Sequence, residues 1–116
     1  MSIIHSQGGA YDVYIGRGRC PRTGRPGRWG NPFRVGPDGD REEVIERYRE
    51  WLWREISSGR IDLAALAALH GKRLGCWCAP SRCHGEILEA AAFWALGQQA
   101  RRLERRVAEL TRQART

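Results

Sequence analysis

The chain has 116 residues and five tryptophans, which is enough for one domain with one core and too little for two. Its formal net charge of +7 comes from two arginine-rich segments, residues 16–34 and 101–116, and such clustered charge favours an anionic partner. The sequence holds no run of eighteen apolar residues and no basic segment leading into an apolar one, so we expect neither a membrane span nor a secretory leader, and we expect a cytoplasmic protein.

The first predicted element is a strand over residues 11–15, where apolar and polar side chains alternate. An irregular segment over residues 16–39 follows, because it holds four of the five prolines and is rich in glycine. Asp40 and Glu43 then form a capping-box pattern, and the apolar residues after them recur at helical spacing. These features predict a helix over residues 41–57.

A second, short helix is predicted over residues 63–69, with Asp62 as its N-cap. Residues 72–77 are the next strand candidate, and they lead into a cysteine-rich loop. Helical spacing resumes over residues 84–96, and a further helix is predicted beyond Gly97. Together these elements predict a single small α/β domain, with a mixed or parallel sheet flanked by helices in a Rossmann-like arrangement and an extra helix at the C-terminal end.

The C-terminal segment repeats small and large apolar residues at steps of three and four. They are Ala100, Leu103, Val107, Leu110 and Ala114. This pattern is an a/d heptad seam that lasts about two heptads. We therefore treat residues 1–97 as the domain and residues 98–116 as an arginine-rich helical extension. Two interpretations of the extension stay open: a terminal helix packed back on the domain, and a seam through which two copies form a homodimer.

The chemistry of the chain is concentrated in residues 76–85, which hold three cysteines and one histidine. The candidate metal ligands are Cys76, Cys78, Cys83 and His84. Residues two apart on an extended segment face the same side, so Cys76 and Cys78 can approach one ion together. In a reducing compartment, cysteines indicate metal binding before they indicate disulfides. The four donors match a closed tetrahedral site, and zinc is the predicted cofactor.

Two other interpretations of this segment stay open. In the first, Cys83 lies at the start of a helix and is a reactive nucleophile, with His84 as its base. In the second, Cys76 and Cys78 are core residues on a buried strand, and the histidine caps a helix. A catalytic zinc ion would need three protein ligands and a bound water, with Glu86 as the candidate general base.

A loop of alternating glycine and arginine, Gly16-Arg17-Gly18-Arg19, follows the first predicted strand. Ligands commonly bind where the strands of an α/β sheet end, so Arg17, Arg19 and Arg28 are candidates to clamp a phosphate group. The loop lacks both the P-loop lysine and the dinucleotide fingerprint, so it specifies no particular nucleotide. A solvated turn of arginines is the alternative interpretation.

The segment Trp29-Gly30-Asn31-Pro32-Phe33 predicts a turn that fixes the arginine-rich loop in place. Asn31 is expected to hold backbone structure, and it is also a candidate ligand contact. Trp29 and Trp77 are candidates to stack on a base. If the two loop-bearing strands are parallel neighbours, ligand and metal would share one cleft at the edge where both strands end.

The predicted function is binding of a phosphate-bearing ligand, a nucleotide or a nucleic acid, with a structural zinc ion. Two alternatives stay open. One is an enzyme that acts on such a ligand, with the cysteine and histidine cluster as its catalytic site. The other is a protein–protein interaction module that dimerises through residues 98–116.

Four motifs in a fixed order carry a resemblance to a known family. They are the segments 13–17, 29–33, 48–52 and 74–86. Over about residues 11–96, the chain resembles the bacterial and phage family called domain of unknown function 4326. The resemblance implies that the cysteine segment and the 29–33 turn belong to one module and that the segment after Gly97 lies outside it. Glu86 stands where we expect aspartate in relatives, and residues 20–28 look like a variable insertion, which argues against a role for Cys20.

Overall fold

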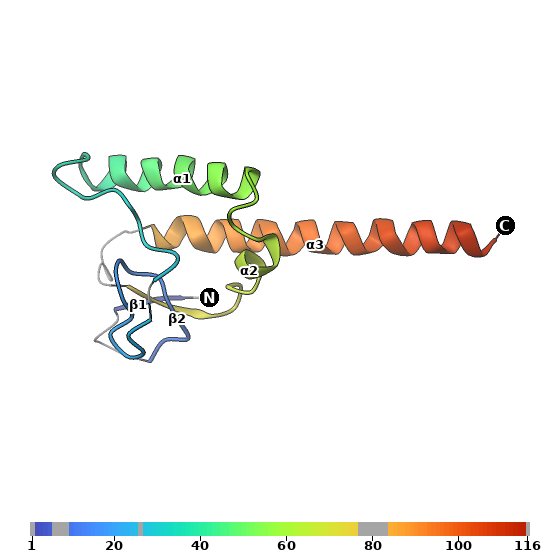
Figure 1. The fold of residues 1–116 in the computed structure, drawn as a ribbon, viewed down its shortest axis with the longest axis horizontal. Coiled ribbons are helices and arrows are strands. Elements are labelled where there is room, and N and C mark those ends of the chain that lie inside the picture. The colour runs from blue at the N-terminus through green and yellow to red at the C-terminus, as the bar shows by residue number, and fades with distance from the viewer. Residues whose placement is uncertain (1, 6–9, 26, 77–83, 116) are drawn as a thin grey trace.

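The computed structural model describes residues 2–5, 10–25, 27–76 and 84–115. The elements are, in chain order, β1 (Ser2–His5), β2 (Val13–Tyr14), α1 (Arg41–Ser57), α2 (Leu63–Ala67), β3 (Arg73–Cys76) and α3 (Gly85–Ala114). The molecule measures 61 × 29 × 22 Å, because the second half of α3 projects out of the body (Figure 1).

The three strands form one parallel sheet in the order β1-β3-β2. The pairing of β2 with β3 extends beyond the two residues of β2. The Asp12 amide donates to the Arg73 carbonyl oxygen, and the Ile15 amide donates to the Gly75 carbonyl oxygen, both at 2.8 Å. The expected α/β fold with a mixed or parallel sheet is confirmed, and the sheet of the described residues is wholly parallel.

The sequence analysis did not predict β1. This strand has four residues, too few to show a clear alternation, but it pairs with β3 from Ser2 opposite Arg73 to His5 opposite Cys76. A strand this short depends on its partner rather than on its own sequence pattern.

Helix α1 has the predicted bounds. The Asp40 carboxylate accepts a hydrogen bond from the Glu43 amide at 2.9 Å, and the Glu43 carboxylate accepts one from the Asp40 amide at 3.2 Å, so the capping box is confirmed. Gly59 follows the helix with φ +81°, the left-handed conformation that often ends helices. Asp62 caps α2 as predicted, and this helix ends at Ala67, two residues before the expected end.

Helix α3 corrects the prediction of two separate helices. The expected helix over residues 84–96 and the expected helix beyond Gly97 are one continuous helix of 30 residues. A Cβ atom on Gly97 would have only the Arg101 guanidinium within 4 Å, at 3.9 Å, so packing does not require glycine there. A glycine inside a helix costs about 1 kcal/mol relative to alanine, which the good helix formers on both sides offset.

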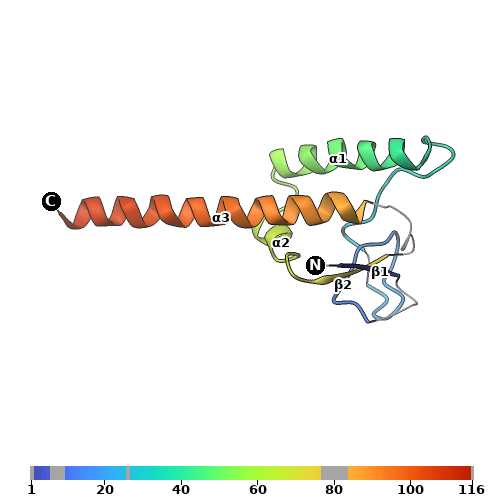
Figure 2. The same ribbon diagram turned by 180° about the vertical axis from the view of Figure 1, so that it is seen from behind.

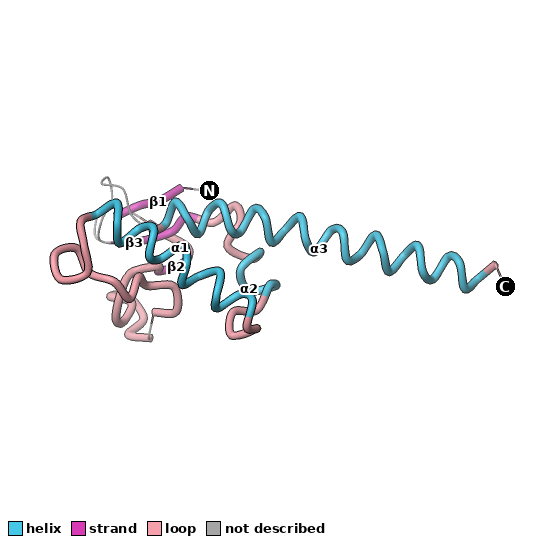
Figure 3. The backbone as a smooth tube through the Cα atoms, turned by 90° about the horizontal axis from the view of Figure 1, so that it is seen from above, coloured by secondary structure: helices cyan, strands magenta, loops and turns pink. Residues whose placement is uncertain are grey.

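The core lies between the sheet and the helices. Its fully buried large side chains are Ile15, Tyr48, Leu52, Leu66, Leu74, Cys76 and Leu88. Figures 1 and 2 show α1 and α3 on the same side of the sheet. In Figure 3 the first half of α3 lies over the strands, while the second half extends beyond them. None of the described helices has an apolar stretch long enough to span a membrane.

Candidate functional site

The carboxyl ends of β2 and β3, after which the two predicted loops begin, lie at one edge of the sheet. These strands are the parallel neighbours that a shared edge requires. The chain leaves β2 through Ile15 and enters the glycine and arginine loop at Gly16, and it leaves β3 at Cys76. The described ends of both segments therefore lie next to each other.

A hydrogen bond joins these two segments. His84 is the N-cap residue of α3 and is buried, and its Nε2 atom lies 2.6 Å from the carbonyl oxygen of Ile15. A carbonyl oxygen only accepts, so Nε2 carries the proton, and in the neutral ring the lone pair is on Nδ1. The ring of Tyr48 packs edge-on against the imidazole, with ring centroids 4.8 Å apart. His84 is thus held in one orientation and one tautomer.

The predicted metal ligands are only partly described. Cys76 is buried at the end of β3, and Glu86 is exposed in the first turn of α3. Cys78, Cys83 and Trp77 lie outside the described residues. Within the described ranges, no three His, Cys, Asp or Glu side chains are grouped to hold a metal ion. The zinc site therefore stays a prediction, of which the structure describes two of the four ligands.

The first two arginines of the loop bind backbone atoms of the protein itself. The Nε atom of Arg17 donates to the Asn31 carbonyl oxygen at 2.6 Å, and its Nη2 atom donates to the Phe33 carbonyl oxygen. The Nη1 atom of Arg19 donates to the Gly24 carbonyl oxygen at 2.9 Å. These contacts give both guanidinium groups a structural role, and their role toward phosphate stays a prediction.

The turn around Asn31 is fixed from both sides. Its Nδ2 atom donates to the Val44 carbonyl oxygen at 3.1 Å, and its Oδ1 atom accepts a backbone amide of the turn at 2.9 Å. The Tyr48 hydroxyl donates to the Trp29 carbonyl oxygen at 2.8 Å. Asn31 therefore has the expected structural role, and the buried Trp29 leaves little of its ring exposed for stacking.

Glycines let the turn lie directly on the loop. A Cβ atom on Gly27 would stand 2.7 Å from the carbonyl oxygen of Gly16, and one on Gly30 would stand 2.9 Å from the same atom. Both distances are shorter than carbon and oxygen atoms tolerate. Close backbone packing therefore holds the loop in place.

Three other arginines of residues 16–34 line a pocket of about 430 Å³ beside β2. It is lined by Arg22, Arg25, Arg28, Tyr11, Tyr14, Trp29, Asp12, Val13, Cys20, Thr23 and Gly27. Its volume lies in the range of small-molecule sites, about 300–1,000 Å³. Sequence reasoning named Arg28 but missed Arg22 and Arg25, because no local pattern sets these two apart from the other arginines of residues 16–34.

The pocket has a positive and aromatic character. The Arg22 guanidinium lies over the Tyr11 ring, 4.0 Å from its centroid, and that of Arg28 lies 5.2 Å from the centroid of a Trp29 ring. The one carboxylate in the lining belongs to Asp12, and it forms an ion pair with Arg73 outside the pocket at 3.1 Å. The three arginines therefore dominate the charge of the pocket.

Cys20 forms part of the pocket wall, which the sequence analysis did not foresee. Its Sγ atom lies 3.4 Å from the Tyr11 hydroxyl. The hydrogen bond with Tyr11, helped by others from Thr23, lowers the pKa of the Cys20 thiol from its ordinary value of 9.0 to about 7. The same hydrogen bond raises the pKa of Tyr11. A thiol with this pKa is partly ionised at neutral pH, which makes it a good nucleophile.

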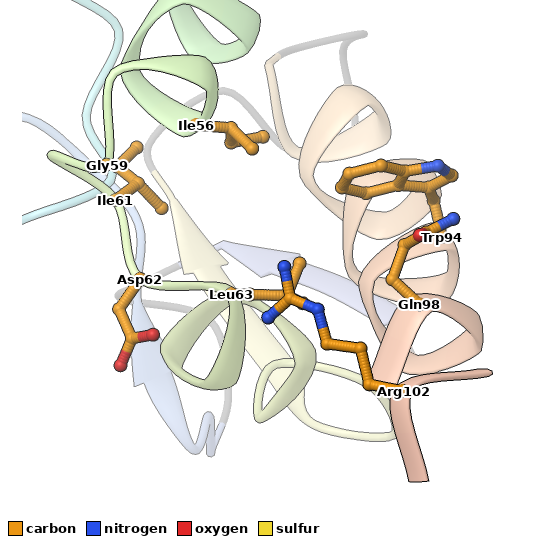
Figure 4. A pocket seen from close by; sticks show the side chains of 8 residues that line it. All are labelled: Ile56, Gly59, Ile61, Asp62, Leu63, Trp94, Gln98 and Arg102. Atoms are coloured by element: carbon orange, nitrogen blue, oxygen red, sulfur yellow. The ribbon is translucent and has the colours of Figure 1, made fainter. Parts of the chain in front are cut away.

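A second pocket, of about 390 Å³, lies between the end of α1, the start of α2 and the middle of α3 (Figure 4). It is lined by Ile56, Gly59, Ile61, Asp62, Leu63, Trp94, Gln98 and Arg102. None of the predicted site residues belongs to this lining. The pocket combines apolar walls with one carboxylate, one amide and one guanidinium group. Its two charged groups are of opposite sign.

Comparisons with known proteins confirm the resemblance. The family described as "Domain of unknown function (DUF4326)" matches residues 4–94. A relative from Enterobacteria phage T4, described as an uncharacterized 12.4 kDa protein in the nrdA-td intergenic region, is 40% identical over 87 residues, which are 74% of this chain and 71% of the relative. No solved structure matches the chain. The family match reaches into β1, and residues 95–116 lie beyond it.

Proposed function

Because this chain belongs to the family described as a domain of unknown function (DUF4326), its function has to be inferred from its own site, and we propose that it binds a phosphate-bearing ligand, a nucleotide or a nucleic acid. The observation that carries this proposal is the gathering of Arg22, Arg25 and Arg28 around one pocket. Guanidinium groups bind phosphate oxygens through paired, charge-assisted hydrogen bonds.

Aromatic rings in the same pocket support a ligand with a base. The rings of Tyr11 and Tyr14 lie 6.4 Å apart and both line the pocket. Bases stack on such rings without regard to their sequence, and arginine planes add to the stacking surface. Tyr14 is buried, so the partly exposed Tyr11, with the Arg22 guanidinium over its ring, is the candidate to contact the base, while the arginines would hold the phosphate.

We propose that zinc supports this site from the edge of the sheet. A histidine that binds a metal ion usually donates its other ring N–H to a carbonyl or carboxylate, as His84 does to Ile15. In such a site the Nδ1 atom of His84 would bind the metal ion, and the buried Cys76 would supply a thiolate. With Cys78 and Cys83, these donors would fit a structural zinc ion, which would tie the cysteine segment to the end of β2.

An enzyme acting on the same ligand is the alternative. In the described geometry, the Nε2 proton of His84 is donated to Ile15, so only Nδ1 carries a lone pair that could accept a proton. A histidine oriented in this way can serve as a metal ligand or as a general base, so metal coordination separates the two functions: four protein ligands favour binding, and three ligands with a bound water favour catalysis.

The Rossmann-like arrangement is also a proposal. Three parallel strands support it, and the candidate ligand-binding loop and the cysteine segment follow the carboxyl ends of two of them, β2 and β3. Doubly wound sheets carry helices on both faces, whereas α1 and α3 lie on one side here (Figure 1). A smaller version of that architecture, with a three-stranded parallel sheet and helices on one face only, fits these observations.

Titration of the full chain with two probes tests the binding function. The probes are ATP and a fluorescent oligodeoxythymidylate of about twelve nucleotides, measured at low salt. We expect at least one of them to bind, and the double variant Arg25→Gln with Arg28→Gln to bind it about tenfold or more weakly, since charge-assisted hydrogen bonds contribute roughly 1.5–3 kcal/mol each. Arg49→Gln, on the exposed face of α1, is the matched control.

The two probes separate the sources of the phosphate group. Binding of ATP alone would identify a nucleotide site, and binding of the oligonucleotide alone would identify a nucleic-acid site. Failure of both probes to bind, or equal affinity of the wild type and the double variant, would contradict the proposal.

A further inference from the structure

One face of α3 carries apolar side chains that the body of the protein leaves exposed. The exposed fractions are 68% for Phe93, 42% for Leu96, 67% for Leu103, 62% for Val107 and 49% for Leu110. With Ala100 and Ala114 they recur at steps of three and four over three heptads. We call these seven residues the α3 seam. The sequence analysis saw only its last two heptads, because it ended a helix at Gly97.

The second half of α3 stands clear of the body in Figures 1 and 3. Every residue from 101 to 115 is exposed. Isolated helices of this length are marginal in water, because most helical stability in proteins comes from packing an apolar face. The exposed seam and the projecting helix therefore both indicate that a partner packs against the apolar face of α3.

We propose that the α3 seam pairs with the α3 seam of a second copy of this chain in a parallel, two-stranded coiled coil. In the projecting part of α3, beyond Gly97, the large apolar residues are confined to the a and d positions, which is typical of a coiled-coil seam. Polar or small residues occupy the e and g positions beside it, namely Gly97, Gln99, Glu104, Arg106, Thr111 and Gln113. A helix that lies on a membrane would present a wider apolar face.

The flanking charges are compatible with the parallel orientation and disfavour one antiparallel register. In a parallel pair, each g position faces the e position five residues later in the other helix. Glu104 of one copy then faces Gln99 of the other, and Arg106 faces Thr111. In the antiparallel register that aligns Leu103 with Val107 of the second copy, Glu104 would face Glu104 and Arg106 would face Arg106, which is unfavourable.

The remaining arginines of the extension avoid the interface. They occupy the outer b, c and f positions and are Arg101, Arg102, Arg105, Arg112 and Arg115. Pairing through the seam therefore places most of the positive charge of this segment on the outer surface of the coiled coil, where water and counterions screen it.

Sedimentation equilibrium of the full chain tests the proposal. We expect a mass of twice 13.2 kDa, with dissociation on dilution, over a range of about 5 to about 200 µM. Leu103→Glu and Leu110→Glu should each raise the dimer dissociation constant about 100-fold or more, because each buries two carboxylates in the seam. Ala108→Glu adds the same carboxylate at an exposed b position and should leave the constant unchanged.

The orientation is tested by Leu110→Cys in an oxidising buffer. A parallel pair brings position 110 of both copies together, so mass spectrometry should find a disulfide between the two introduced cysteines. Circular dichroism verifies that each variant keeps its helices. A monomer at the highest concentration, a dimer that Leu103→Glu does not weaken, or a Leu110→Cys dimer that forms no such disulfide would overturn the proposal. So would a monomer that binds anionic phospholipid vesicles through the seam.

Discussion

The Nε2 atom of His84 donates a 2.6 Å hydrogen bond to the carbonyl oxygen of Ile15, a residue 69 positions earlier in the chain. This contact connects the start of α3 to the point where β2 turns into the glycine and arginine loop. It gives the cysteine segment and the loop a common anchor at one edge of the sheet. The position of the start of α3 therefore depends on the position of the end of β2, and the reverse holds as well.

Replacement of His84 by alanine tests this anchor. The change removes a buried ring that packs on Tyr48 and leaves the Ile15 carbonyl oxygen without its donor. We expect the free energy of unfolding in urea to fall by about 2–4 kcal/mol. His70→Ala, at an exposed position, should change it by less than about 0.5 kcal/mol. Equal stability of the two variants would show that the anchor contributes nothing.

Two glycine substitutions should have opposite effects. Gly27→Ala places a Cβ atom 2.7 Å from the Gly16 carbonyl oxygen, so the loop must shift, and we expect a loss of about 1–3 kcal/mol in stability. Gly97→Ala lies inside α3 with open space around it, so it should stabilise the protein by about 0.5–1 kcal/mol. Urea denaturation measures both effects, and a destabilising Gly97→Ala would contradict the account of α3.

The Cys20 thiol should react as a thiolate near neutral pH. Its pKa is lowered to about 7, chiefly by the Tyr11 hydroxyl, so the alkylation rate with iodoacetamide should rise with pH and reach half its maximum near pH 7. Tyr11→Phe removes the hydrogen bond, so the midpoint should move upward toward 9.0 and the rate at pH 7 should fall. Peptide mapping separates Cys20 from the other cysteines, and an unchanged midpoint in Tyr11→Phe would refute this assignment.

Metal analysis of the purified protein tests the zinc proposal. Protein prepared without chelator should contain about one equivalent of zinc. Cys78→Ser should lose most of it, while Cys20→Ser, in the pocket beside β2, should keep it. If the wild-type protein contains less than about a tenth of an equivalent of zinc or iron, the zinc proposal is wrong.

The parts of the fold that were predictable from sequence depend on local interactions. Helix α1 was predicted to the residue, because the Asp40 and Glu43 side chains cap it within four residues of sequence. Strand β1 was missed because only its pairing with β3 defines it. The break expected at Gly97 was wrong, because one glycine is too weak to end a helix that good helix formers continue.

The site was predictable only in part for the same reason. The sequence placed the glycine and arginine loop and the cysteine segment at strand ends, and parallel pairing of β2 with β3 follows that expectation. The pocket was not foreseen, because it depends on how residues 20–28 fold back. The Cys20 amide donates to the Arg25 carbonyl oxygen at 2.8 Å, and Gly24 closes this turn with φ +71°. Such contacts decide which arginines face the pocket, and no local pattern reveals them.

Protection of Cys20 by ligand tests the central claim most directly, because this thiol lies in the wall of the arginine pocket. With a saturating amount of whichever probe binds, ATP or the oligodeoxythymidylate, the alkylation rate of Cys20 at pH 7.5 should fall by about tenfold or more. In the double variant Arg25→Gln with Arg28→Gln, the same amount of probe should give much weaker protection. A probe that binds the wild-type chain while Cys20 reacts at its original rate would place the ligand elsewhere and contradict the account.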